Sequence, residues 1–327
     1  MQPASRTNRW FAAAAVALMA SFAGQAKAQT YPERAIKIVL PFGAGGVADV
    51  SSRIVADKLG ERLGQRFLIE NMPGAGGIGA AKAVLAAPAD GYTLGLVTNG
   101  TAISAAIFNK LPFDPVNEFD MISTLGTFDL VFAVNAAGRY KTLADFIAAA
   151  KAAPGKLNVG TVNVGGTQHL GAELLKTAAG IEVQIVPFRN SPDIVVQLLR
   201  GDLDMMVDFP PAVKGAVDDG RLRLLATSGP KRSAFMPDLV TVAEAGVPGY
   251  EVTSWNGVFA PHGTPPHVVA LINAKLKDVL ALPDVKRRLL ELGIEAKPSS
   301  PEELMSLFKA DVKKWDAVIV KAGIEKK

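Results

Sequence analysis

The sequence predicts an α/β protein built from mostly parallel sheets with helices on both faces. Three observations lead to this fold class. Apolar, β-rich runs alternate with segments of helical periodicity along almost the whole chain. Turn-rich joints, "APADGYT", "LPFDP", "AAPGKLN" and "GVPGYE", separate the segments. Hydrophobic residues make up 49% of the 327 residues, which suits a large core.

Each strand is predicted from a short apolar run bounded by turn residues. The predicted strands are 35–41, 66–70, 93–98, 119–125, 129–134, 157–161, 182–187, 203–208, 222–227 and 250–259. Helices are predicted where apolar residues recur every three or four positions, at 47–63, 77–86, 142–152, 168–179, 192–200 and 211–217. From residue 266 onward the pattern is helical. It ends in 301–322, whose apolar stripe includes Trp315, so this tryptophan is assigned to the core.

The first 28 residues indicate export from the cytoplasm. Arg6 and Arg9 form a positive region, and the apolar run "WFAAAAVALMASFAG" is short for a bilayer span. Ala26 and Ala28 flank Lys27 in an A-x-A cleavage signal. An uncleaved membrane anchor is the alternative. We expect residues 1–28 to be a signal peptide and the mature protein to begin at Gln29 in the periplasm.

Composition excludes several classes of function. Without the three basic residues of the leader, the net charge falls from +4 to about +1, and the remaining basic residues are scattered. This predicts no nucleic-acid partner. The chain has no cysteine, which excludes disulfides and thiol catalysis. Its three histidines lack metal-ligand spacing and no G-x-S-x-G elbow occurs, so no metal, no cofactor and no catalytic residue is predicted.

The stretch "IKIVLPFGAGGVAD", residues 36–49, raises the main question about function. A strand, a glycine loop and a helix start expose backbone N–H groups to an anion. Residues 43–48 fit G-x-G-x-x-A and residues 74–79 fit G-x-G-x-x-G, which is also typical of dinucleotide binding. The export signal and the bulk of Phe42 argue against a dinucleotide. At this point a nucleotide, a small carboxylate, or glycines that only allow tight turns all remain open.

Two further features lie in the middle of the chain. In "NVGTVNVGGTQHLGAELL", a glycine loop again leads into a helix, at which Thr167 serves as a cap alone or as a cap and a ligand donor. His169 in the first turn is either packed or solvated, or it contacts a ligand. Asp208 ends a strand before a Pro pair and either caps the next helix or faces a cleft.

Together, these segments resemble a known family. "YPERAIKIVLPFGAGGVADVSSRIVADKLGERLGQRFLIENMPGAGGIGAAKAVLAAPADGYTL" strongly resembles Bug-type solute-binding proteins, the exported receptors of tripartite tricarboxylate transporters. "LPFDPVNEFDMIS", "GGTQHLGAELL", "LATSGPKRSAFMPDLVTVAEAGVPGYEVTSWNGVFAPHGTP" and "KWDAVIVKAGI" follow in the family's order. The resemblance implies two α/β lobes of the type II periplasmic-binding kind that close on a small carboxylate.

The resemblance also implies which residues bind the ligand. The first loop would grip a carboxylate through backbone amides and ordered waters, and the middle loop would grip it from the other lobe. Because the two glycine loops contain no Arg or Lys, we expect neutral donors, among them Thr167 and Asn99, to carry recognition, with Arg189 secondary. The "NMPGAGGIG" segment is interpreted as a structural turn. The full set of expected ligand-binding residues is Phe42, Gly43, Ala44, Gly45, Gly46, Val47, Ala48, Asp49, Asn99, Gly165, Gly166, Thr167, His169, Arg189 and Asp208.

Departures from the family pattern bear on the ligand. The family commonly has Pro, Gly and Thr at the positions of Gly43, Val47 and Ala48, and "VPFRNSPD" replaces a frequent Y-K-G-S run. These changes favour an apolar-bodied or aromatic carboxylate over citrate.

Domain organisation and partners follow from the same resemblance. Lobe one is expected to comprise 29–130 plus 251–327 and lobe two 131–250, with strands crossing near 128–134 and 250–259. The expected partners are the ligand and the membrane subunits of a tripartite tricarboxylate transporter, and we expect a monomer. Alternatives are a receptor for a sensor kinase and, from a different class, an exported or nucleotide-cofactor enzyme.

Overall fold

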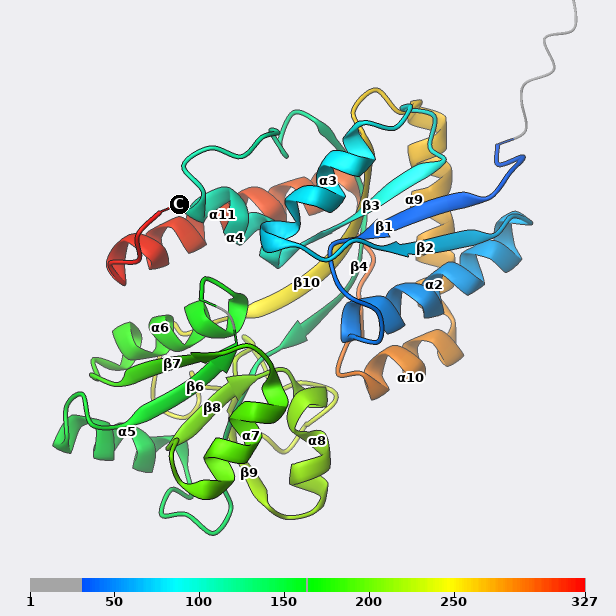
Figure 1. The fold of residues 1–327 in the computed structure, drawn as a ribbon. Helices are drawn as coiled ribbons and strands as arrows, with labels where there is room; N and C mark the ends of the chain where they lie inside the picture. Colours follow the sequence, from blue (N-terminus) through cyan, green and yellow to red (C-terminus); the bar gives the residue numbers. More distant parts are fainter. Residues whose placement is uncertain (1–30, 163, 327) are drawn as a thin grey trace, which may run out of the picture.

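A computed structural model of the chain describes residues 31–162 and 164–326. They form two sheets, each with its own helices (Figure 1). In the first sheet, β1 pairs in parallel with β2 and β3, whereas β10 runs antiparallel to β3 and β4. The order is β11 (Glu295–Ala296), β4 (Phe119–Asp129), β10 (Thr253–Pro261), β3 (Thr93–Thr98), β1 (Ile36–Leu40) and β2 (Phe67–Asn71). This sheet and its helices are called lobe one.

The second sheet also combines parallel and antiparallel pairs, so both sheets are mixed rather than mostly parallel as the sequence predicts: among the described residues, four strand pairs are parallel and five are antiparallel. Strand β6 is parallel to β7 and β8, and β5 is antiparallel to β8 and β9. Its order is β7 (Gln184–Phe188), β6 (Asn158–Val162), β8 (Met205–Asp208), β5 (Val131–Asn135) and β9 (Leu222–Thr227). This sheet and its helices are called lobe two.

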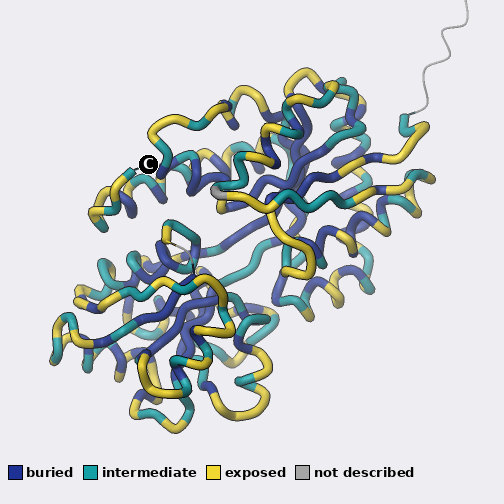
Figure 2. The backbone as a smooth tube through the Cα atoms, in the orientation of Figure 1, coloured by how far each residue is buried: buried dark blue, intermediate teal, exposed yellow. Residues whose placement is uncertain are grey.

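Helices cover both faces of each sheet, and the strands between them are buried (Figure 2). In lobe one, one face carries α3 (Ile78–Leu85), α4 (Asn99–Ile107) and α11 (Pro301–Lys321), and the other carries α2 (Val47–Leu63), α9 (Pro266–Ala281) and α10 (Pro283–Glu291). In lobe two, α5 (Leu143–Ala152) and α6 (Thr167–Ala179) contribute to one core cluster, and α7 (Ser191–Arg200) and α8 (Pro210–Asp218) to another.

Helix α11 shows how local sequence sets an element. Ser300 and Glu303 form a capping box at its start, and Pro301 occupies the first turn, where its missing N–H costs nothing. Leu304, Phe308 and Trp315 are fully buried against the sheet, as the apolar stripe predicts.

The chain passes between the lobes twice. Leu130 separates β4 from β5, and its N–H donates to the Ser228 hydroxyl (2.7 Å). The return lies before Thr253, because Val252 still donates its N–H to the Ser228 carbonyl in lobe two (2.8 Å). A strand predicted over 250–259 therefore begins three residues later in the structure, since Tyr250 and Val252 are tied to lobe two.

Some predicted elements differ from the structure. Helix α4 follows β3 directly and was not predicted, because "NGTAISAAI" contains Gly, Thr and Ile, which are weak helix formers. Strand β4 continues to Asp129 instead of ending at 125. The predicted signal peptide and its cleavage before Gln29 lie outside the described residues. No helix in the part of the chain that the structure describes combines the length and apolarity needed to cross a bilayer.

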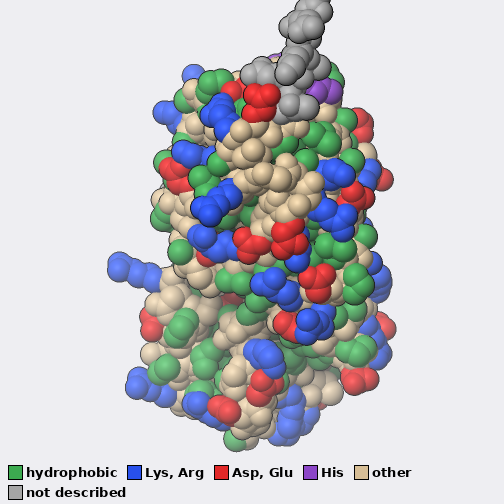
Figure 3. Space-filling model, turned by 90° about the vertical axis from the view of Figure 1, so that its right-hand side faces the viewer, with side chains coloured by type: hydrophobic (Ala, Val, Ile, Leu, Met, Phe, Trp, Pro, Cys, Tyr) green, Lys and Arg blue, Asp and Glu red, His purple; other side chains and the backbone are tan. Residues whose placement is uncertain are grey.

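Surface charge is mixed in the way the composition predicts. Cationic and anionic side chains alternate over the face in Figure 3. Within the described residues, no group of three His, Asp or Glu side chains is placed to hold a metal ion.

Candidate functional site

Three glycine-containing loops, each between a strand and a helix, contribute to one cavity. They follow β1, β2 and β6 and lead into α2, α3 and α6. The first contributes Pro41 and Phe42 but none of residues 43–49, and the other two contribute glycines. The cavity has a volume of about 640 Å³, and α4 supplies much of the remaining wall. The lining residues are Pro41, Phe42, Gly74, Gly76, Gly77, Thr98, Gly100, Thr101, Ile103, Ser104, Ile107, Phe108, Val164, Gly165 and Gly166.

Helices α2 and α6 begin in the same way on opposite lobes. Their N-cap residues are Gly46 and Gly166, with φ of −77° and −79° and ψ of 169° and 168°, and neither helix is capped by a side chain. Helix α7, by contrast, is capped by Asn190, which accepts the N–H of Asp193 (3.0 Å). The first-turn N–H groups of α2 and α6 are therefore left for an anion, which the helix dipoles also favour.

The first loop is held in shape by the carboxylate of Asp49. Gly45 has a φ of +84°, and its N–H donates to Asp49 Oδ2 (2.9 Å). Arg53 donates to both carboxylate oxygens (3.1 Å each), and Asn71 donates to Asp49 Oδ1 (2.9 Å) and to the carbonyl of Phe42 (3.1 Å). The bond from Arg53, with those from Gly45 and Asn71, lowers the pKa of Asp49 to about 2. Asp49 therefore shapes the loop from inside the protein.

Thr167 and Asn99 contact each other across the two lobes. The Thr167 hydroxyl donates to Asn99 Oδ1 (2.9 Å), and Asn99 Nδ2 donates to Asp311 Oδ2 (2.6 Å). Trp255 Nε1 donates to the same carboxylate oxygen (2.7 Å). Asn99 is 0% exposed and Thr167 is 8% exposed. Burial raises the pKa of Asp311, although the bonds from Trp255 and Asn99 oppose this.

The other candidates in lobe two lie in different environments. Asp208 is 2% exposed, and its Oδ1 accepts from Gln168 (3.1 Å) and from the N–H of Phe209 (2.8 Å). Its Oδ2 and the Nδ1 of buried His169 have no hydrogen-bond partner among the described residues. Burial raises the pKa of Asp208 and lowers that of His169. Arg189 is exposed beside the α7 cap.

The structure adds residues that sequence reasoning assigned to a turn or did not assign. Gly74, Gly76 and Gly77 line the cavity, although "NMPGAGGIG" was interpreted as structural only. Ile107 of the unpredicted helix α4 and Phe108 directly after it form an apolar wall with Val164. The second GAGG spelling was a signal for the glycines, and the apolar residues at helical spacing, Ala102, Ile103, Ala106 and Ile107, were a local signal for α4.

The first loop is the most exposed part of this region. Phe42 lines the cavity and is 40% exposed, and Gly43, Ala44, Gly45 and Gly46 after it are exposed as well. Val47 and Ala48 are half-buried where α2 begins.

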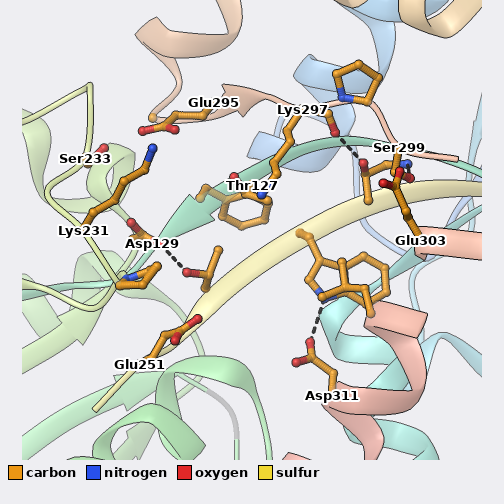
Figure 4. Close-up of a pocket in the computed structure, with 18 of the residues that line it drawn as sticks. Thr127, Asp129, Lys231, Ser233, Glu251, Glu295, Lys297, Ser299, Glu303 and Asp311 are labelled. Atoms are coloured by element: carbon orange, nitrogen blue, oxygen red, sulfur yellow. Dashed lines mark hydrogen bonds between the residues drawn. The ribbon is translucent and has the colours of Figure 1, made fainter. Parts of the chain in front are cut away.

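A second cavity, of about 530 Å³, lies at the two crossings (Figure 4). Asp129 and Thr253 flank the crossings, Asp311 lines it from α11, and Lys231 reaches it from lobe two. No residue of the three glycine loops lines it. Burial raises the pKa of Asp129 to about 6, against the hydrogen bond from Thr253 (2.8 Å). This space is called the hinge cavity.

Comparisons with known proteins agree on the family. The family described as "Tripartite tricarboxylate transporter family receptor" matches residues 51–324. Protein BugT of Bordetella pertussis is 30% identical over 310 residues, which are 94% of this chain and 95% of BugT. A UPF0065 protein in the gbd 5' region of Cupriavidus necator is 34% identical and covers 96% of each chain.

Solved structures show the same two-lobed fold. The protein Rpa4515 of R. palustris with adipate has a TM-score of 0.80 at 34% identity, over 90% of this chain and 99% of that one. MatC of Rhodopseudomonas palustris with bound malate has a TM-score of 0.75 at 31% identity, over 88% and 100%. The periplasmic binding protein BugD has a TM-score of 0.77 at 29% identity, over 91% and 100%. The chain belongs to the tripartite tricarboxylate transporter family of receptors, and it is a Bug-type solute-binding protein.

Proposed function

We propose that the protein captures a small carboxylate between its lobes in the periplasm and delivers it to the membrane subunits of a tripartite tricarboxylate transporter. The observation that supports this most directly is the pair of uncapped helix starts, α2 in lobe one and α6 in lobe two. Two such N-termini favour an anion between them. Binding of adipate and of malate by two structural relatives agrees with a carboxylate.

The proposed site combines the first loop, Phe42 to Asp49, with Gly165, Gly166 and Thr167. Asp49 acts by shaping the loop, and Thr167 contributes its backbone N–H, because its hydroxyl proton is already donated to Asn99. His169 and Asp208 are candidates for polar contacts, since each keeps a buried atom without a partner among the described residues. We further propose a monomer with lobes at 29–130 plus 251–327 and at 131–250.

The cavity wall suggests the chemistry of the ligand. Its described lining residues carry no charged side chain, and Phe42, Ile107 and Phe108 give it apolar surface. Val164, another lining residue, is 53% exposed. Backbone amides at one end and apolar side chains along the wall fit a carboxylate with a hydrocarbon body. Citrate, with three charges, fits this wall less well.

A thermal-unfolding screen with mono-, di- and tricarboxylates tests this proposal. A ligand present at about 100 times its Kd adds roughly 2.7 kcal/mol to the free energy of unfolding. Calorimetry then gives the Kd, and chromatography of the released ligand shows whether it is chemically unchanged, as expected of a receptor. A screen without any stabilising carboxylate, or a ligand returned as a different compound, would contradict the proposal.

Two variants test which groups bind the carboxylate of the ligand. Gly46→Leu should weaken binding at least tenfold while the fold remains intact, because the nearest atom to an added Cβ is 4.0 Å away and the side chain blocks approach to the amides. Gly215→Leu, on an exposed turn of α8 with open space, is the matched control. Arg189→Ala should change the Kd less than twofold, whereas a bidentate arginine clamp would lose about 1.5–3 kcal/mol. A tenfold loss in Arg189→Ala with none in Gly46→Leu would show a charge clamp instead.

A further inference from the structure

A chain of four polar side chains runs from the ligand-binding helix of lobe two into the centre of lobe one. Thr167 at the start of α6 bonds to Asn99 of α4, which bonds to Asp311 of α11, which accepts from Trp255 of β10. The four are 0–8% exposed. Three elements of lobe one, α4, α11 and β10, are thus linked in series to one hydroxyl of lobe two.

Donor and acceptor chemistry gives this chain a fixed direction. An indole N–H can only donate, and the unprotonated oxygen of a carboxyl group can only accept, whether the group is ionised or neutral. The oxygen of Asp311 that accepts from Trp255 therefore also requires a donor from Asn99, which must be Nδ2. The amide oxygen of Asn99 then faces Thr167, whose hydroxyl must donate. If the amide were rotated by 180°, its oxygen would oppose the carboxylate.

We propose that Asp311 is a positioning residue that orients the Asn99 amide and so creates the hydrogen bond by which the lobes hold each other at α6. The bond to Thr167 is made only when the first turn of α6 lies against α4, the arrangement in which Gly165 and Gly166 join Ile107 in the cavity wall. Loss of the correct amide orientation removes this interlobe bond and leaves a buried hydroxyl and amide unpaired, which favours separated lobes.

This inference rests on the proposed function for its effect on affinity but not for its effect on lobe separation. Asp311 lies between the two cavities, since it lines the hinge cavity while its partner Asn99 begins the helix that walls the ligand cavity. Figure 4 shows Asp311 on α11. Its carboxylate accepts the Nε1 proton of Trp255, which lies on the strand that returns to lobe one. The carboxylate therefore couples the hinge strand to the ligand-binding helix.

The distance between the lobes is the primary measurement. The chain has no cysteine, so a Lys110→Cys and Lys151→Cys pair, at exposed positions in lobes one and two, carries two spin labels without background. In the ligand-free protein, Asp311→Leu should move the distance distribution away from that of the parent. Asp311→Asn should keep the parent distribution, because one amide oxygen can accept from both Trp255 and Asn99.

Two further variants act from the other end of the chain. Thr167→Val removes only the donor hydroxyl and should shift the distances as Asp311→Leu does, and Thr167→Ser should restore them. Tyr250→Phe is the matched control, because it removes a buried hydrogen bond to the same helix, from the Tyr250 hydroxyl to the Gly171 carbonyl (3.0 Å), without touching Asn99. It should leave the distances unchanged. Circular dichroism and melting confirm that each variant is folded, and Thr167→Val decides the matter if Asp311→Leu does not fold.

Affinity is the second measurement, made with the carboxylate that stabilises the parent most. Asp311→Leu and Thr167→Val should each raise the Kd at least fivefold, and Tyr250→Phe less than twofold. Unchanged distances in Thr167→Val, or an Asp311→Asn protein that opens like Asp311→Leu, would overturn the inference. If the parent binds no carboxylate, the proposed function fails, and the distances of the ligand-free variants still decide the role of Asp311.

Discussion

At the scale of single residues, the carboxylate of Asp49 holds the shape of the loop that we propose to bind an anion. Asp49 is 3% exposed and accepts hydrogen bonds from the Gly45 N–H and from the Arg53 guanidinium. The N-terminal amides of α2 then remain free, because the acid bonds to the loop and to side chains. The N-terminal amides of α2 are thus available to a ligand, whereas the neighbouring Asp49 carboxylate holds the loop in shape.

Removing the charge of Asp49 should destabilise the protein in a pH-dependent way. Its pKa, lowered to about 2 by Arg53 first of all, means that its stabilisation is present above pH 4 and is lost as the pH falls through about 2. Asp49→Asn should lose about 1–2 kcal/mol at pH 7, discounted for the half-exposed Arg53. Urea unfolding at pH 7 and pH 3 measures this, with exposed Asp219→Asn as the control. An equal loss at both pH values would assign the effect to packing.

At the scale of elements, the GAGG loop before α3 has a structural reason for its glycines besides its place on the cavity wall. Gly76 has a φ of +64°, and a Cβ there would lie 2.9 Å from Ser104 Oγ and 3.0 Å from a ring carbon of Phe108. The loop therefore sets how closely α4 packs against the end of β2.

Gly76→Ala should cost about 1–3 kcal/mol, because alanine is strained at this φ and its Cβ pushes on α4. Gly79→Ala is a matched control three residues later, inside α3, where an added Cβ meets nothing within 4 Å. It should be neutral or stabilise by about 0.5–1 kcal/mol through helix propensity. Urea unfolding of both variants checks the contrast, and equal effects would show that the loop's conformation does not require glycine.

Helices with a regular apolar stripe could be predicted from the sequence. Helix α2 occupies the predicted residues 47–63, and α11 differs from its prediction by one residue at its end. Both have a regular apolar stripe, and α11 also has a capping box. Helix α4 was missed because its nine residues are held by α11 and the β2–α3 loop more than by their own propensity. Its role in the cavity was missed with it.

At the scale of the whole molecule, contacts between distant segments were the least predictable. Asn99 and Asp311 are 212 residues apart, and Thr167 lies 68 residues from Asn99 in the other lobe. A single sequence shows no pattern that pairs them, so Thr167 and Asn99 were assigned to the ligand and not to each other. The two glycine helix starts, by contrast, were predictable, since each is a local strand–loop–helix pattern.

The hinge itself contains a titratable group with consequences for the whole molecule. Asp129 ends β4, Thr253 begins β10, and Gly229 of lobe two packs so closely on the carboxylate that a Cβ would lie 2.2 Å from Oδ2. Burial, then Glu295 and Glu251, raise the pKa of Asp129 to about 6, while Thr253 and Lys231 oppose them. The ionised form is thus disfavoured where the lobes meet.

Asp129→Asn should therefore stabilise the protein at pH 7.5 and have little effect at pH 3. Near pH 3 the carboxyl is protonated in the folded chain and mostly protonated in the unfolded chain, where its pKa is about 3.9, so it contributes little difference. As the pH rises toward 6, Asp129 ionises in the unfolded chain before it ionises in the folded chain. Above pH 6 the folded chain bears the full free-energy cost of burying the ionised carboxylate, about 1–2 kcal/mol after allowance for partial exposure. Asparagine avoids this cost, and its amide oxygen can still accept from Thr253 (2.8 Å in the parent). Urea unfolding from pH 3 to 7.5 measures the gain against exposed Asp238→Asn. A gain that does not grow with pH would mean that Asp129 ionises in the hinge as freely as it does in the unfolded chain.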